Sequence, residues 1–235
     1  MSVDAQAPVN QSVERAARLL ALFSVDEPEL SLAEVTTRLG TSKATAHRYT
    51  TALRRAGLLR ATPGGYTLGP RIVELAATAL AGLGILKVAG PHMERLVARA
   101  NETVVLSVWD GEAPVVVRVD DNTDRLVRIN VRTGSRLPLD SAQGKVFATF
   151  ALGLDGLDDV RASGLAFNER IVEGIAALAA PVFQGDELVA AIALVGTTAA
   201  IRPETDSGPA RALRETAAGL SAELGFLRTE ERRSA

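Results

Sequence analysis

Apolar side chains recur at three- and four-residue steps near the start of the chain, a spacing typical of helices that pack on one face. They predict helices over about residues 12–24, 32–39 and 43–57. Ser31 and Glu34 have the spacing of a capping box, and Gly40 is placed to end the second helix. Thr41 or Ser42 would cap the third. Two short helices joined by a tight glycine turn predict a helix-turn-helix.

Two short runs of β-forming residues follow this motif. They are Leu58-Leu59-Arg60 and Tyr66-Thr67-Leu68, with Pro63-Gly64-Gly65 between them. A Pro-Gly-Gly turn between two such runs indicates a hairpin. A helix-turn-helix followed by a small hairpin is a winged helix.

The hydrophobic period changes in the second half of the chain. A helix from about Pro70, interrupted at Gly82, Gly84 and Gly90, leads to another helix that we expect to begin at Pro91. Three β-rich runs follow, TVVLSVW, PVVVRVD and LVRINVRT. A helix over about 141–152, two strands (AALAAPVF and LVAAIALVG) and a final helix over about 203–228 complete the pattern. This order of elements predicts an α+β fold.

Charge is distributed unevenly along the chain. The net charge is −2, yet residues 35–73 contain seven basic residues and neither Asp nor Glu. A polyanion-binding surface needs such a segment, because a misplaced carboxylate repels the phosphates that arginines attract. A basic surface without a role is the alternative on charge alone. Together with the order of helix, helix-turn-helix and wing, the charge pattern predicts binding to duplex DNA.

The motif also predicts which residues contact the DNA. In a helix-turn-helix the start of the second helix reaches base edges, while arginines further along meet phosphates and set the register. Backbone N–H groups at the wing can also meet phosphates. The predicted DNA-binding residues are Ser42, Lys43, Thr45, Ala46, His47, Arg48, Arg54, Arg55, Arg60, Thr62, Gly64 and Gly65.

Composition argues against several other classes of protein. The absence of cysteine excludes disulfides, thiolate zinc sites and cysteine nucleophiles, and it fits a reducing, cytoplasmic location. His47 and His92 lie too far apart in sequence to build a His-rich metal cluster. No apolar run is long enough for a membrane span, and the N-terminus lacks the pattern of a signal peptide. We therefore expect no metal, no cofactor, no membrane association and no enzymatic activity.

The chain resembles the IclR family of bacterial transcription regulators. The resemblance is carried by QSVERAARLLALF, LSLAEVTTRLGTSKATAHRYTTALRRAGLLR and GGYTLGPRIVELA, and more loosely by RLPLDSAQGKVFATF, EGIAALAAPVF and ELVAAIALVG. It implies a winged helix-turn-helix domain, a linker helix and a C-terminal effector domain of GAF/PAS-like α/β fold. It also implies homodimers, or dimers of dimers, on pseudo-palindromic operators. The predicted organisation is a disordered tail (1–9), a winged helix-turn-helix domain (10–69), a linker helix (70–89), an effector-binding and dimerisation domain (90–228) and a charged tail (229–235).

The resemblance further implies a small-molecule pocket between the sheet and the loop before the middle helix. Matched by motif, its residues are Ser141, Ala142, Gln143, Gly144, Asn168, Glu169, Ala177, Ala193 and Val195. Ala177 stands where the family often has cysteine, and Ala193 and Val195 where it often has serines. These losses would leave a small carboxylate such as glyoxylate or pyruvate with an unpaired oxygen.

We therefore expect a larger or more apolar effector, such as an aromatic acid or lactone, with Ser141, Gln143 or Glu169 as the polar contact. The alternative is that the three alanine and valine positions are ordinary core residues and no small ligand exists. For the whole chain we expect a DNA-binding transcriptional regulator, more in keeping with a repressor than an activator. The alternatives are an enzyme or a protein-interaction module that carries a winged helix.

Overall fold

The structure, a computed structural model, describes residues 10–122, 131–170 and 172–234, of which 226–234 are described by their backbone only. Its contacts divide the chain into two compact units, Met1–Leu80 and Ala81–Ala235. The tail expected over 1–9 and most of the strand expected at LVRINVRT lie outside the described residues. Helices and strands are mixed in both units, so the prediction of an α+β fold is confirmed.

The first unit is a winged helix. Its elements are α1 (Gln11–Leu20), β1 (Glu29–Leu30), α2 (Leu32–Leu39), α3 (Lys43–Arg55), β2 (Leu59–Ala61), β3 (Tyr66–Leu68) and most of α4 (Pro70–Gly82). The three strands form an antiparallel sheet in the order β1-β3-β2. Leu19, Leu30, Val35, Leu53 and Leu59 lie at the centre of one small core that joins the helices to this sheet.

Local sequence explains how α2 and α3 begin and end. The predicted capping box is present, because the Ser31 hydroxyl accepts a hydrogen bond from the Glu34 N–H and the Glu34 carboxylate accepts one from the Ser31 N–H. Gly40 ends α2 in the left-handed conformation, with φ of 62°. Ser42 rather than Thr41 caps α3, through the Thr45 N–H. The wing has a third strand, β1, that the sequence analysis did not predict, because two residues carry no visible period.

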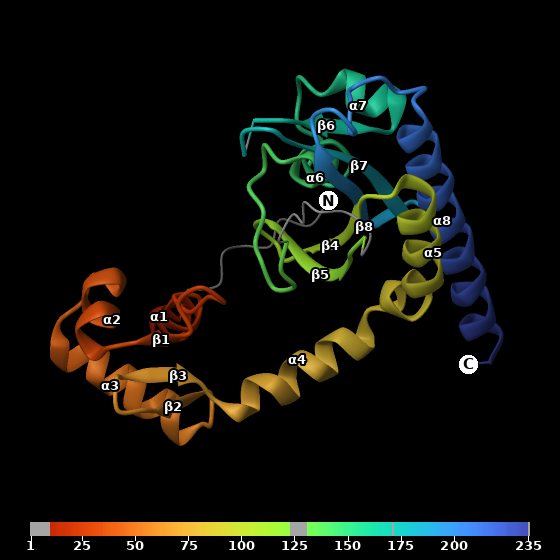
Figure 1. Cartoon of the computed structure of the whole chain (residues 1–235). Helices are drawn as coiled ribbons and strands as arrows, with labels where there is room; N and C mark the ends of the chain where they lie inside the picture. Colours follow the sequence, from red (N-terminus) through yellow and green to blue (C-terminus); the bar gives the residue numbers. More distant parts are fainter. Residues whose placement is uncertain (1–9, 123–130, 171, 235) are drawn as a thin grey trace. The chain divides into compact units, whose positions relative to one another are not determined.

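The second unit is built on a five-stranded antiparallel sheet in the order β5-β4-β8-β7-β6 (Figure 1). Its strands are β4 (Thr103–Trp109), β5 (Pro114–Asp120), β6 (Ala166–Asn168), β7 (Ile175–Gln184) and β8 (Glu187–Thr197). Its helices are α5 (Gly84–Ala100), α6 (Ala142–Phe150), α7 (Asp158–Ser163) and α8 (Gly208–Ser234).

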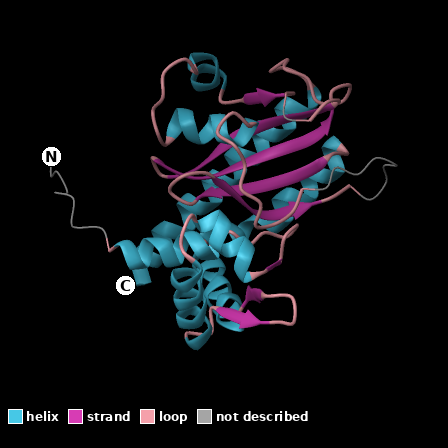
Figure 2. Ribbon diagram, turned by 90° about the vertical axis from the view of Figure 1, so that its left-hand side faces the viewer, coloured by secondary structure: helices cyan, strands magenta, loops and turns pink. Residues whose placement is uncertain are grey.

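Alternation along the strands buries both faces of this sheet. Leu106, Leu178 and Ile192 point to the face covered by α5 and α8. Their neighbours Ala179 and Ala191 point to the other face, where α6 packs (Figure 2). Side chains alternate between the faces of a strand, so a sheet covered on both sides reads as the nearly continuous apolar runs seen in β7 and β8.

Several predicted boundaries in the second unit were wrong. Pro91 does not open a helix; it lies inside α5, and the chain breaks at Leu83 instead. The buried face formed by Ala89, Met93 and Leu96 continues through the proline at steps of four and three residues, and this packing outweighs the lost hydrogen bond. The final helix begins at Gly208 rather than at about residue 203, and it continues to Ser234 through most of the expected charged tail. Helix α7 and strand β6 were not predicted.

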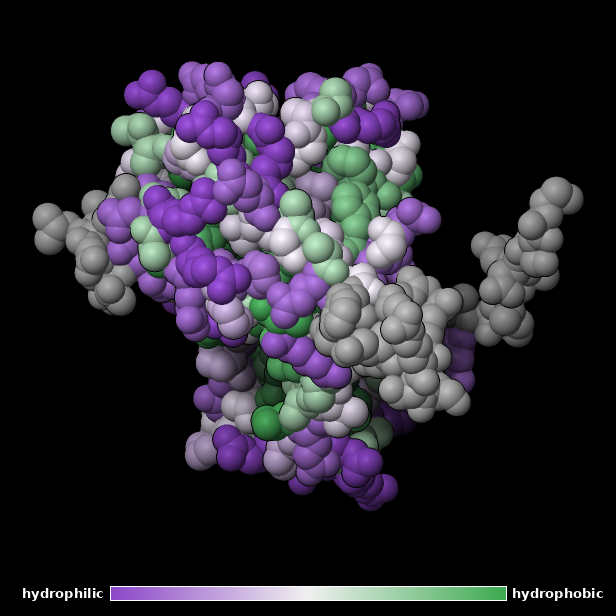
Figure 3. All heavy atoms as spheres, turned by 90° about the vertical axis from the view of Figure 1, so that its right-hand side faces the viewer, coloured by the Kyte–Doolittle hydropathy of each residue, from purple (hydrophilic) through white to green (hydrophobic). Residues whose placement is uncertain are grey.

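Among the described residues, no single helix is long and apolar enough to cross a membrane. Only α4 and α5 taken together reach that length and composition, and the pair is bent at its break. Much of α5 is buried on its own sheet. Hydrophilic residues cover much of the surface seen from the side of α8, with apolar residues between them (Figure 3).

Gly144 fixes how closely the loop before α6 approaches that helix. A Cβ at this position would lie 2.4 Å from the Pro138 carbonyl oxygen and 2.5 Å from that of Leu139. We expect Gly144→Ala to lower the free energy of unfolding by about 1–3 kcal/mol, because backbone cannot yield as a side chain can. Urea unfolding of the full chain measures this. Gly208→Ala, where a Cβ meets nothing within 4 Å, is the control; equal losses in the two variants would contradict the explanation.

Candidate DNA-binding face and effector cavity

The basic residues predicted to bind DNA lie on the surface of the first unit. Lys43, Arg48, Arg54, Arg55 and Arg60 are all exposed, and none of them takes part in an ion pair within the described residues. The first four lie on α3 and Arg60 lies on β2. Five cations without acidic partners are free to meet phosphates.

The start of α3 offers mainly short polar side chains. Ser42 and His47 are exposed, and Thr45 is half-buried. The Ser42 hydroxyl caps the helix, and it also donates a hydrogen bond to the Thr45 hydroxyl at 3.0 Å. The prediction that Ala46 contacts DNA is wrong. Its side chain is fully buried in the core of the unit, so it faces away from the surface that the other predicted residues form.

Tyr49 anchors the inner side of the same helix. Hydrogen bonding to the Ser12 side chain, together with that from Arg15 and the charge of Arg48, lowers the pKa of Tyr49 despite the opposite effect of desolvation. The Arg48 guanidinium carbon lies 5.9 Å from the centre of the Tyr49 ring, a distance at which a cation is attracted to the face of an aromatic ring. These contacts hold α3 against α1 and orient Arg48.

Two acidic residues that precede the acid-free segment 35–73 in the sequence contact that segment in the fold. Glu27 accepts two hydrogen bonds from the Arg38 guanidinium, at 2.6 and 2.7 Å, and this pairing holds the pKa of Glu27 below its usual range. Glu29 accepts a short hydrogen bond from the Thr62 hydroxyl at the wing. Arg38, one of the seven cations, is thus neutralised, and the carboxylate of Glu29 lies against the wing turn. Sequence reasoning missed both contacts, because they join residues 11 and 33 positions apart.

The predicted wing residues are therefore already engaged. The Gly65 N–H donates to the Thr62 carbonyl and hydroxyl oxygens, at 3.3 and 3.1 Å, so it is not free for a phosphate in this conformation. Thr62 donates its own hydroxyl proton to Glu29. Gly64 is exposed at the tip of the turn.

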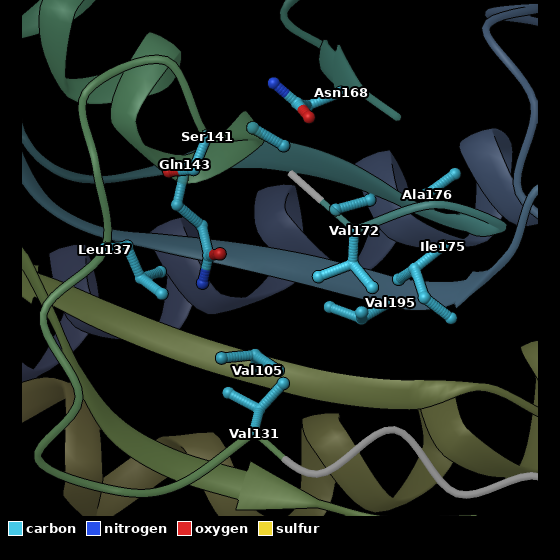
Figure 4. Close-up of a pocket in the computed structure, with 12 residues that line it drawn as sticks. Val105, Val131, Leu137, Ser141, Gln143, Asn168, Val172, Ile175, Ala176 and Val195 are labelled. Atoms are coloured by element: carbon cyan, nitrogen blue, oxygen red, sulfur yellow. The ribbon is translucent and has the colours of Figure 1, made fainter. Parts of the chain in front are cut away.

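The second unit contains a cavity of about 200 Å³ between the sheet and the start of α6 (Figure 4). Six of the nine predicted effector residues line it, namely Ser141, Ala142, Gln143, Asn168, Ala177 and Val195. Three do not: Gly144 contacts the preceding loop, Glu169 is exposed, and Ala193 is buried under α6. The remaining lining residues, which the sequence analysis did not name, are Val105, Val131, Leu137, Val172, Ile175 and Ala176.

Polar groups gather at the α6 end of this cavity. The Ser141 hydroxyl accepts the Gly144 N–H at 2.9 Å as the helix cap. The Asn168 amide donates to the Asp140 carbonyl and accepts from the Arg170 N–H. Gln143 is only 3% exposed, and its side-chain nitrogen has no hydrogen-bond partner. Figure 4 shows that this side chain extends from α6 into the cavity, toward Val105 and Val131.

No charged side chain lines the cavity among the described residues. An unpaired amide N–H in an apolar surrounding costs roughly 1–3 kcal/mol. The arrangement can accept a mainly apolar molecule that offers one hydrogen-bond acceptor to Gln143. Within the same part of the chain, no three His, Cys, Asp or Glu side chains are grouped so that they could hold a metal ion.

Comparison with known proteins identifies the family. The model described as "IclR helix-turn-helix domain" matches residues 12–63, and that described as "Bacterial transcriptional regulator IclR C-terminal" matches residues 77–152. The chain belongs to the IclR family of bacterial transcription regulators. It is a DNA-binding regulator and not an enzyme.

Individual relatives cover nearly the whole chain. The glycerol operon regulatory protein of Streptomyces griseus is 31% identical, over 92% of this chain and 96% of its own. The DNA-binding transcriptional repressor YiaJ of Escherichia coli is 26% identical, over 92% and 89%. Both matches extend across the winged helix and most of the second unit.

Solved structures share the fold. An IclR regulator from Alicyclobacillus acidocaldarius has a TM-score of 0.74 at 26% identity, and covers 94% of this chain and 100% of its own. An IclR homologue from Microbacterium hydrocarbonoxydans, solved with 4-hydroxybenzoate, has a TM-score of 0.72 at 24% identity over 91% and 98%. The prediction of a winged helix-turn-helix followed by an α/β effector domain is thereby confirmed.

An ion-pair cluster holds the segment that contributes Leu137 to the cavity wall. Arg136 lies 2.9 Å from Asp110 and 3.0 Å from Glu112, at the turn between β4 and β5. Burial alone would raise the pKa of Asp110, but hydrogen bonds from the Ala113 and Glu112 N–H groups and from Arg136 outweigh it and lower the pKa.

A group with a lowered folded-state pKa stabilises the fold above its unfolded pKa of about 3.9, and this stability is lost as pH falls through the folded value. We therefore expect Asp110→Asn to flatten the dependence of unfolding free energy on pH in the acid range below about pH 5. Urea unfolding at a series of pH values measures the slope. Asp186→Asn, an exposed aspartate in the turn between β7 and β8, is the control, and an equal change in both variants would contradict the assignment.

Proposed function

We propose that this IclR-family protein is a transcriptional repressor whose effector is a small, mainly apolar organic acid or a related carbonyl compound. The observation that carries the proposal is the unpaired, buried Gln143 amide in a cavity that is otherwise apolar. Of the three polar contacts considered from the sequence, Glu169 is exposed, and the Ser141 hydroxyl accepts the cap bond of α6 but keeps its own proton to donate. Gln143, whose buried side-chain nitrogen has no partner, is the main donor for the ligand, with the Ser141 hydroxyl as a second one.

The size of the cavity limits the ligand to about one ring. A cavity of ~150 Å³ accepts benzene, and this one measures about 200 Å³. Pyruvate and glyoxylate are almost wholly polar and would bury little apolar surface against Ala177 and Val195, whereas an aromatic ring fills the apolar space and leaves its carboxylate for Gln143. The related protein that was solved with 4-hydroxybenzoate supplies a suitable first probe.

On the DNA side, we assign phosphate contacts to Arg48, Arg54, Arg55 and Arg60, and contacts at base edges to the exposed residues at the start of α3. The support is their exposure and the lack of acidic partners in the described chain. Phosphate contacts set affinity and register, while base contacts set sequence preference. A repressor role is supported by the name of the related E. coli protein, and a cytoplasmic location follows from the proposed role on DNA.

A homodimer, or a dimer of dimers, on a pseudo-palindromic operator completes the proposal. Two recognition helices would then enter successive major grooves about 34 Å apart. Helix α4 supports self-association, because it has no buried residue and exposes Val73 and Leu75. An effector can shift such an assembly between two arrangements only if it binds one of them more tightly.

Binding to DNA should depend on the unpaired arginines and not on Arg38. We expect Arg48→Ala and Arg55→Ala each to weaken binding to a random-sequence duplex and to reduce the slope of log affinity against log salt by about one unit. Arg38→Ala is the matched control, because Glu27 already pairs with that side chain. Fluorescence anisotropy across a potassium chloride series measures the slopes. Unchanged slopes in both test variants would contradict the phosphate contacts and favour a protein-interaction role.

Effector binding should depend on the Gln143 amide. We expect 4-hydroxybenzoate or benzoate to raise the melting temperature of the wild-type protein, whereas pyruvate and glyoxylate leave it unchanged. Gln143→Leu removes an unpaired buried donor, so it should stabilise the free protein while it weakens binding of the ring acid by about fivefold to a hundredfold.

Isothermal titration calorimetry and thermal unfolding measure the two effects, which have opposite signs. Gln184→Leu makes the same change at the end of β7, outside the cavity, and should leave ligand binding as it is. Tight binding of pyruvate or glyoxylate would overturn the proposed ligand class.

A further inference from the structure

The wing of this protein carries a carboxylate at its turn. Glu29, in β1, accepts a hydrogen bond from the Thr62 hydroxyl, which lies just before the Pro63-Gly64-Gly65 turn. Its carboxylate also lies against the backbone of that turn, because a Cβ on Gly64 would come within 2.6 Å of Glu29 Oε1. The acid is therefore adjacent to the tip of the hairpin that a winged helix presents to DNA.

Backbone contacts of Gly65 hold the turn in this position. A side chain at Gly65 would overlap the Leu30 carbonyl oxygen, which lies 2.2 Å from the place of a Cβ, and Gly65 has a φ of 154°. The Thr62 N–H donates to the Gly65 carbonyl at 2.9 Å, and the Gly65 N–H donates back to Thr62. Thus the glycine that lets the turn approach β1 also keeps its N–H engaged within the hairpin.

No cation neutralises Glu29 within the part of the chain that the structure describes. Glu29 pairs with Thr67 on β3, and Thr67 pairs with Arg60 on β2. Directly paired residues share one face of a sheet, so Glu29 and Arg60 lie on the same face with a whole strand between them. The acid and the wing arginine Arg60 therefore lie on one face of the sheet, separated by Thr67, and do not form an ion pair.

From this geometry we infer that Glu29 is a specificity-determining residue for DNA binding, and the inference rests on the proposed DNA-binding role of the winged helix. Its carboxylate repels the phosphate backbone at the wing and so lowers the affinity that does not depend on sequence. The four cations on α3 then supply most of the attraction to phosphates, and correct contacts at the start of α3 decide which duplex is bound.

Glu29→Gln tests this directly, because the amide oxygen of glutamine can still accept the Thr62 hydrogen bond while the charge is lost. We expect the full-length variant to bind a random-sequence duplex about three- to tenfold more tightly at low salt, and the difference to shrink as salt rises. Binding to a duplex selected by the wild-type protein from a random pool should tighten less, so the ratio of specific to nonspecific affinity should fall.

Glu74→Gln is the matched control, since Glu74 is an exposed acid on α4 of the same unit and, like Glu29, has no ion pair within the described residues. The inference predicts that the gain in nonspecific affinity is much smaller in this variant. Equal gains in the two variants would show that only net charge matters and would overturn the inference. Unchanged or weaker binding of Glu29→Gln to both duplexes would also overturn it, and would assign Glu29 to holding the wing or to accepting a hydrogen bond from a base.

Thr62→Val keeps the carboxylate and removes the hydroxyl that tethers it. If repulsion from a fixed position matters, this variant should not reproduce the tighter nonspecific binding of Glu29→Gln; equal tightening in both would contradict the inference. Failure of this inference is distinguishable from failure of the proposed function. Salt-dependent binding of the wild-type protein to the random duplex tests the function, whereas the difference between wild type and Glu29→Gln tests the role of the wing carboxylate.

Discussion

Close approach of backbone to backbone at single glycines sets the geometry of both functional regions. At Gly65 the wing turn meets the carbonyl oxygen of Leu30, and at Gly144 the start of α6 meets the carbonyl oxygens of Pro138 and Leu139. A methyl group at either position would occupy space that these oxygens already fill. The first contact brings Glu29 to the wing, and the second positions the loop that precedes Ser141 and Gln143. Neither region could keep its present form with a larger residue at its glycine.

The elements with strong local signals were predictable from the sequence. The capping box at Ser31 and Glu34 and the left-handed Gly40 fixed the bounds of α2 without any tertiary information. The β-rich runs TVVLSVW and PVVVRVD located β4 and β5 to the residue. Most of the predicted cavity residues came from the resemblance to the family, and the structure places six of the nine around one space.

What sequence reasoning missed was decided by tertiary contacts. Pro91 is a helix breaker by local chemistry, yet α5 runs through it because its buried face continues on both sides. Strand β1 has only two residues, and it exists because Glu29 and Leu30 pair with β3. The apolar half of the cavity wall includes Val105, Leu137 and Ile175, which come from separate elements of the second unit. No local motif could have grouped them.

The distribution of charge along the sequence does not by itself give the distribution of charge on the folded surface. The segment over 35–73 contains no acid, but the fold returns Glu27 to Arg38 and Glu29 to Thr62. The first contact removes a cation from the set available to phosphates, and the second adds an anion at the wing. The positive surface is consequently concentrated on α3, where Arg48, Arg54 and Arg55 have no acidic neighbour in the described structure. A compact positive surface of this kind would tie affinity to the same helix to which we assign the base contacts.

We propose that the cavity of the second unit is a ligand site and not a packing defect. In a cavity that results only from imperfect packing, we expect an apolar lining with no unpaired hydrogen-bond donor. Here Gln143 is buried with its side-chain nitrogen unpaired, and a core with no ligand to bind would be more stable with leucine at that position. The small residues at Ala142, Ala177 and Val195 keep the space open next to this amide. An unpaired donor beside a preserved space is an arrangement that a bound acceptor would complete.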